Sequence, residues 1–144
     1  MERSRKKEVV EWGWDTSPIL LPLAYEPKEE NAIVAAFTIA EYCGSKVLVY
    51  HVRNDADTEV AREKALRLLD EHAKTFKVNY EVKESNKVVD ADNVAFISKS
   101  IVEAAKEAGC QAIVMSAHRE SFLRELLGRI SDRVARKADT KVIL

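Results

Sequence analysis

Strand-like and helix-like segments alternate along nearly the whole chain, and this alternation constrains the fold more than any other feature. Short apolar runs that are typical of buried strands are separated by stretches in which apolar residues recur with helical spacing. We expect strands at 19–23, 46–52, 78–83, 112–115 and 140–144. Because alternation at these lengths requires crossover connections, it predicts a parallel sheet with helices on both faces.

The helices between these strands carry their own start and stop signals. The first ends at Gly44, the second begins at Thr58, and the third begins at Asp92 and ends at Gly109. Together the elements predict a doubly wound, Rossmann-like α/β fold with five parallel strands in the order 3-2-1-4-5. Ligands of such sheets bind outside the carboxyl ends of the strands, where the strand order reverses. The segments that face this point are 24–30 and 116–128.

Composition limits the classes of protein to which this fold can belong. The 144 residues make about one domain, and a hydrophobic content of 47% excludes wholesale disorder. A formal net charge of −1 argues against a nucleic-acid partner. No apolar run approaches the roughly 20 residues of a membrane span. Cys43 and Cys110 give no disulfide framework. We therefore expect a cytoplasmic protein that does not insert into a membrane.

Residues 1–16 differ from the rest and form an N-terminal extension, so that the domain itself comprises 17–144. The extension is basic at its start and carries Trp12 and Trp14 before a Thr-Ser-Pro break. One interpretation is a frayed segment with a tryptophan packed against the body. The other is an arm that docks onto a partner or leads to another domain.

The histidines provide little catalytic or metal-binding potential. None has a His or Cys at the spacing that a metal site on one helix requires, so we expect no metal. His51 ends an expected strand and is best explained as a packed or locally hydrogen-bonded residue. His72 lies at the edge of an apolar helix face. His118 lies in the site-facing loop and is a candidate contact for a substrate or anion. With no nucleophile motif either, we expect no catalytic residues and no enzyme.

Three segments in order resemble the universal stress protein family. They are the strand ILLPL with the later AAFTIAEYCGSKVLVYHV, the segment IVEAAKEAGCQAIVMSAH, and the close LLGRISDRVARKADTKVIL. The resemblance covers residues 17–144. It implies the doubly wound fold, which is also described as adenine-nucleotide alpha-hydrolase-like, and a role in the stress response.

One branch of that family binds ATP. Its motif is Gly-x2-Gly-x9-Gly-Ser/Thr after the fourth strand, together with an Asp after the first. The glycines allow backbone N–H groups to approach phosphate, and a helix N-terminus adds further donors.

This chain departs from the ATP motif at nearly every position. Ser116 and Arg119 stand where the first two glycines belong, and eight residues instead of nine precede Gly128. Arg129 replaces the Ser or Thr, and Ala24 takes the place of the Asp. ATP is therefore a disfavoured cofactor, and we expect weak or no binding. Any nucleotide or other ligand at this site would meet Ala24, Tyr25, Ser116, His118, Arg119, Gly128 and Arg129.

The last strand gives an expectation about assembly. A bare sheet edge is a hazard unless it is paired or protected, and in universal stress proteins the last strand commonly pairs with its twofold mate. The resemblance therefore implies a homodimer. Its contacts would be Lys141, Val142, Ile143 and Leu144.

These observations favour a dimeric, non-catalytic regulatory or adaptor module in a stress response, acting on an unidentified protein partner. The first alternative is a signalling protein that binds ATP or AMP in a remodelled pocket. The second is a soluble regulatory domain that works beside a membrane transporter, to which the tryptophan-containing extension attaches.

Overall fold

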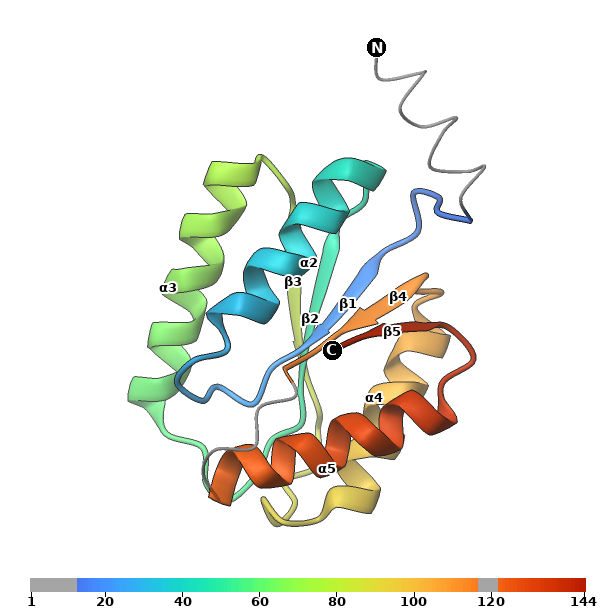
Figure 1. Ribbon diagram of the computed structural model, residues 1–144. Coiled ribbons are helices and arrows are strands. Elements are labelled where there is room, and N and C mark those ends of the chain that lie inside the picture. The colour runs from blue at the N-terminus through green and yellow to red at the C-terminus, as the bar shows by residue number, and fades with distance from the viewer. Residues whose placement is uncertain (1–12, 117–121) are drawn as a thin grey trace.

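The computed structural model describes residues 13–116 and 122–144, and of 122–128 only the backbone. Nine elements follow one another in the described part of the chain (Figure 1). They are β1 (Ile19–Pro22), α2 (Glu30–Cys43), β2 (Val47–His51), α3 (Glu59–Phe76), β3 (Tyr80–Glu84), α4 (Val94–Glu107), β4 (Ala112–Val114), α5 (Phe122–Lys137) and β5 (Lys141–Ile143).

The sheet has the predicted topology. Its strand order is β3-β2-β1-β4-β5, and all the pairings are parallel. The three central strands are buried throughout, whereas β3 alternates between half-buried and exposed residues, as the sequence predicts for an edge strand. The order reverses between β1 and β4, so the predicted ligand-binding point lies at their carboxyl ends.

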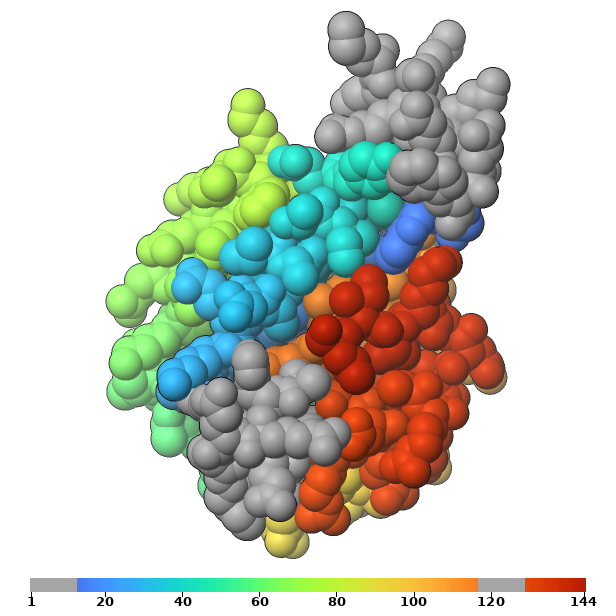
Figure 2. Space-filling view, viewed as in Figure 1, coloured from blue at the N-terminus to red at the C-terminus, as the bar shows by residue number. Residues whose placement is uncertain are grey.

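Helices cover both faces of the sheet (Figure 1). On one face, Leu21 and Val49 of the strands pack with Phe37 of α2 and Leu69 of α3. On the other face, strand residues pack with α4 and α5. The buried members of this second layer include Leu20, Ile113, Ile101, Ile130 and Val134. In the space-filling view α2 and α3 form one surface, and the C-terminal residues lie exposed beside it (Figure 2).

Local signals explain most of the helix boundaries. The Thr58 hydroxyl accepts from Ala61 N and caps α3, as expected. The prediction that Asp92 caps the third helix was wrong, because the Asn93 side chain accepts from Phe96 N instead. Gly44 ends α2 at φ +70°, a left-handed conformation that glycine adopts without steric cost.

Several bounds differ from the predicted ones by one or two residues. Pro22, not Leu23, is the last residue of β1, although the Leu23 N–H still donates to Tyr50 O of β2. The third strand begins at Tyr80 instead of residue 78, since Val78 N–H still bonds back to Ala73 O at the end of α3. The last helix, α5, begins at Phe122, inside the segment 116–128 that was expected to face the ligand-binding point.

The segment before β1 is attached to the body. Gln111 bonds to the backbone of residues 15 and 17 through its amide group. Lys141 Nζ donates to Gly13 O at 2.9 Å and lies 4.9 Å from the Trp14 ring centroid. Trp14 thus packs against the body near β5, while Trp12 lies outside the described residues. Cys43 and Cys110 are both buried and free.

Candidate functional site

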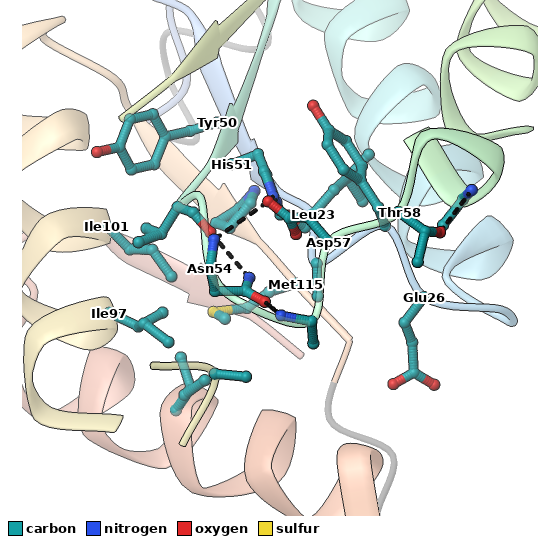
Figure 3. A pocket seen from close by; sticks show the side chains of 18 of the residues that line it. Leu23, Glu26, Tyr50, His51, Asn54, Asp57, Thr58, Ile97, Ile101 and Met115 are labelled. Atoms are coloured by element: carbon teal, nitrogen blue, oxygen red, sulfur yellow. Dashed lines mark hydrogen bonds and ion pairs between the residues drawn. The ribbon is translucent and has the colours of Figure 1, made fainter. Parts of the chain in front are cut away.

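A cavity of about 260 Å³ opens at the carboxyl ends of β1, β2 and β4 (Figure 3). Its lining comes from the segments after β1 and β2, from the start of α3, and from α4 and α5. This is the point at which the topology places a ligand. The volume lies just below the roughly 300–1,000 Å³ of typical small-molecule sites, so it suits a small ligand.

The two sides of the cavity differ in polarity. Ile97, Ile101 and Met115 line one side, and His51, Asn54, Asp57 and Thr58 line the other (Figure 3). The isoleucines come from α4 and are almost fully buried. The polar side chains come from the end of β2 and the loop to α3. The site is therefore an apolar hollow with a polar rim along one edge.

His51 is buried to 1% exposure and bonded at both ring nitrogens. Nδ1 lies 2.7 Å from Leu23 O, and Nε2 lies 2.9 Å from each carboxylate oxygen of Asp57. Leu23 O can only accept, so Nδ1 donates to it. The interpretation of His51 as a hydrogen-bonded strand-end residue is confirmed. It ties β1 to the loop after β2.

Tyr25 lies across this histidine. Its ring stacks on that of His51 with the centroids 3.9 Å apart, and its hydroxyl donates to Glu84 Oε2 at 2.6 Å. Burial and the Glu84 carboxylate raise the pKa of the phenol far above its ordinary value. Tyr25 also has φ +59°, which is unusual for an aromatic residue. Its neighbours therefore hold it in a strained conformation.

Glu29 holds the loop that carries Tyr25. Its side chain is 6% exposed, and its carboxylate accepts from Ala24 N at 3.0 Å and from Glu26 N at 2.9 Å. The Tyr25 N–H also bonds to it. Burial raises the pKa of Glu29 to about 7, although these backbone bonds lower it. Successive backbone N–H groups of this kind form an anion-binding nest, and here an internal carboxylate fills it.

A second, polar hollow of about 590 Å³ adjoins the first, and Tyr25 is part of its lining. Arg62 Nε donates to Glu84 Oε2 at 3.1 Å within it. Burial pushes the pKa of Glu84 up, but the bonds from Tyr25 and Arg62 outweigh it and leave the pKa below its ordinary value. Tyr25 lines both hollows, as do Asn54, Asp57 and Thr58.

The structure brings only part of the predicted site together. Ala24 and Tyr25 line the cavity. Ser116 directly follows the lining residue Met115 and is half-buried. Gly128 and Arg129 lie in the interior of α5, where Arg129 is exposed. His118 and Arg119 lie outside the described residues.

Sequence reasoning missed most of the residues that shape the cavity. Asn54 and Asp57 follow the predicted second strand without belonging to any motif, and Ile97 and Ile101 have the ordinary spacing of an apolar helix face. Only their place in the predicted fold could have indicated such residues, because the carboxyl ends of β1, β2 and β4 meet at one edge of the sheet. Glu29 gave no signal, since its role depends on how the loop folds back over it.

Other chemistry finds little support in the part of the chain that the structure describes. Residues 13–116 and 122–144 contain no group of three or more His, Cys, Asp or Glu side chains placed to hold a metal ion. His72 Nε2 lies 2.8 Å from Glu30 Oε2 in an ordinary pair at the edge of α2 and α3. Within the same residues, no helix combines the length and apolarity that crossing a membrane requires.

Comparison with known proteins agrees with this architecture. A universal stress protein in complex with cAMP has a TM-score of 0.65 and 21% identity, covering 89% of this chain and 94% of that one. A universal stress protein from Archaeoglobus fulgidus has a TM-score of 0.62 and 21% identity, covering 88% and 96%. One from Archaeoglobus fulgidus in complex with dAMP has a TM-score of 0.59 and 20% identity, covering 88% and 95%. No curated protein sequence matches this chain.

The fold and the cavity define a doubly wound α/β protein with a small-ligand hollow at its topological switch point. The sequence model of the Universal stress protein family matches residues 16–144. The chain therefore belongs to the universal stress protein family, a stress-response-related class, as its sequence indicates.

Proposed function

We propose that the chain is a dimeric, non-catalytic regulatory module of the universal stress protein type, without tight ATP binding. A single observation carries the nucleotide part of this proposal. Gly128, the one residue retained from the ATP motif, lies inside α5. Interior helix N–H groups bond to carbonyls four residues earlier, so Gly128 has no free N–H to offer a phosphate.

The residues around the remaining motif positions support the same conclusion. Ser116 carries a side chain where the ATP-binding branch has a bare backbone. Ala24 has no carboxylate, and its N–H is bonded to Glu29. A phosphate cradle depends on several backbone donors that a phosphate can approach. The Cβ of Ser116 hinders that approach, and Glu29 already occupies the Ala24 N–H.

Isothermal titration calorimetry with ATP and Mg²⁺ tests the proposal. We expect no saturable heat up to millimolar ATP, together with no shift in melting temperature. Micromolar affinity would correspond to about −8 kcal/mol of binding free energy, and that result would overturn the proposal.

A second candidate function is a signalling protein that binds a nucleotide in a remodelled pocket. The cavity at the switch point favours it, as do two structural neighbours that hold cAMP and dAMP. Titrating AMP and cAMP under the same conditions separates the two functions. Nucleotide found in an acid extract of the purified protein would favour this second one.

The dimeric part of the proposal rests on β5. Among the described residues this strand pairs with β4 on one side and is the last strand of the sheet. Leu144, which follows it, is 56% exposed. An unpaired edge that ends in an exposed apolar residue is a template for a second strand, and the twofold mate of this chain would supply one.

A further inference from the structure

We propose that the cavity at the carboxyl ends of β1, β2 and β4 binds a small, uncharged and largely apolar ligand, of about the size of two or three aromatic rings. The inference rests on the proposed function in one respect, because it takes this cavity as the module's ligand site. It goes further by assigning the chemical class of ligand.

The apolar side of the cavity provides the driving force. Ile97, Ile101, Met115 and Ile130 all line it, and each is at most 8% exposed. Burial of apolar ligand surface contributes roughly 25 cal/mol per Å² removed from water. A ligand that fills this hollow therefore gains most of its affinity from contacts that need no hydrogen bond.

The polar rim offers few free groups. The two ring nitrogens of His51 are bonded to Leu23 O and to the Asp57 carboxylate, which also accepts from Asn54 N. Asn54 donates its amide to Val52 O, and Thr58 accepts from Ala61 N.

These bonds involve the polar groups of the rim that could form hydrogen bonds with the edge of a nucleobase. Val52 O and Leu23 O, the two carbonyls at the strand ends, already accept from side chains of the same protein. Each of these carbonyls has one lone pair left, so a base finds fewer partners here, and each of its donors or acceptors left unpaired in a buried site costs about 1–3 kcal/mol. The rim therefore discriminates against ligands that need several hydrogen bonds.

The loop after β1 discriminates against anions. Its N–H groups at residues 24–26 converge on the Glu29 carboxylate, so the place of an anion is already taken. The Nε2 atom of His51 is likewise already bonded to the Asp57 carboxylate, 2.9 Å away. The described lining contains the carboxylates of Glu26 and Asp57 but no Lys or Arg, so burying an anion in this apolar hollow is strongly unfavourable. The structure thus favours a neutral ligand.

A pair of fluorescent probes with one ring skeleton tests the charge preference. Anilinonaphthalene is neutral, and anilinonaphthalene sulfonate carries a negative charge on the same rings. In fluorescence titrations we expect saturable one-site binding of the neutral probe, at least about tenfold tighter than the sulfonate. Excess adenosine should not displace it. Equal or tighter binding of the sulfonate, or displacement by adenosine, would overturn the assigned ligand class.

Filling the cavity tests the location. Ile101→Trp places a large ring in the hollow and should weaken binding of the neutral probe at least about tenfold. Val60→Trp is the matched control, because Val60 of α3 is 63% exposed and outside the cavity. If Ile101→Trp loses its helical circular dichroism, the smaller change Ile97→Phe replaces it. Unchanged probe binding in a folded cavity-filled variant would refute the location.

The outcomes keep the two proposals apart. If neither ATP nor the neutral probe binds, the ligand class assigned here fails and the regulatory module without ATP binding stands. If ATP binds with micromolar affinity, the proposed function itself fails.

Discussion

Glu29 is a buried carboxylate whose charged form is opposed by burial and favoured by the N–H groups of its own loop. Its pKa in the folded protein is about 7, above its ordinary 4.5. The folded state therefore binds the proton more tightly than the unfolded chain does. The stability that this proton contributes is complete below pH 4.5 and is lost as the pH rises through about 7.

The Glu29→Gln variant tests this linkage. Between pH 4.5 and pH 7.5 the free energy of unfolding of the wild type should fall by on the order of 3 kcal/mol more than that of the variant. Urea unfolding at several pH values measures it. Glu41→Gln changes an exposed carboxylate and is the control. Parallel curves for the wild type and Glu29→Gln would show that Glu29 does not titrate in this range.

Tyr25→Phe isolates the hydroxyl from the ring. The phenyl ring keeps the stack on His51, but Glu84 loses the 2.6 Å bond from the phenol and keeps the one from Arg62. We expect a loss of about 1 kcal/mol in the free energy of unfolding and a rise in the pKa of Glu84, because a bond that favours its charged form is gone. Denaturant unfolding and a carboxyl NMR titration measure the two effects.

A double-mutant cycle checks the cause. In a Glu84→Gln background, Tyr25→Phe should cost less than it does in the wild type, because the charged acceptor is already absent. An equal cost in both backgrounds would mean that the hydroxyl acts through something other than Glu84.

Single residues divide clearly into those that the sequence reveals and those that it does not. His51 was predictable as a bonded strand-end residue, because a polar side chain at the end of a buried strand needs a partner. Glu29 was not, since three backbone groups converge on it only after the loop has folded. Asp and Asn both cap helices well, so the sequence did not show which of Asp92 and Asn93 would be the cap. In the structure α4 begins at Val94, and Asn93 caps it.

At the level of elements, periodicity predicted the order and type of every strand and most helices. The strand positions 46–52 and 112–115 became β2 and β4 with ends displaced by about one residue, which hydrogen bonding at the ends decides. The start of α5 at Phe122 was missed, although Phe122, Leu123, Leu126 and Leu127 have a helical spacing that Ile130 and Val134 continue. The position of this helix start matters for function, because it places Gly128 inside α5.

The β5 strand carries a prediction about assembly. Met115 N donates to Ile143 O, so Lys141 and Ile143 direct their backbone groups toward β4. Neighbouring residues of a strand point in opposite directions, and Val142 therefore turns its N–H toward the free edge. Val142→Pro removes that N–H without removing a bond to β4. We expect a dimer for the wild type and a monomer for this variant.

Light scattering coupled to size-exclusion chromatography at about 50 μM, well above a micromolar dissociation constant, measures the assembly. Val142→Ala shortens the same side chain but keeps the N–H, and should remain dimeric. A monomeric wild type at this concentration would rule out the dimer, and a dimeric Val142→Pro would place the contact elsewhere.

For the whole molecule, one topological fact organises the site. Strand order 3-2-1-4-5 makes the connections after β1 and β4 leave on opposite faces, so a hollow opens between them whatever the loops contain. The sequence could therefore predict where the cavity lies. It could not predict what the cavity accepts, because that depends on which backbone groups the loops have already bonded, as Glu29 and Asn54 show.

The same reasoning predicts how ATP binding could be restored. The changes Ala24→Asp, Ser116→Gly, Arg119→Gly and Arg129→Ser, with one residue inserted between 119 and 128, rebuild the motif of the ATP-binding branch. They return bare backbone to the phosphate side and lengthen the loop, which should free Gly128 from the helix interior. Calorimetry should detect saturable ATP binding where the wild type shows none.

The control keeps Ser116 and Arg119 but contains the other changes and the insertion, and it should not bind ATP. If the complete variant also fails to bind, side chains at the motif positions are not what excludes the nucleotide, and the bonds that close the cavity rim become the cause to test.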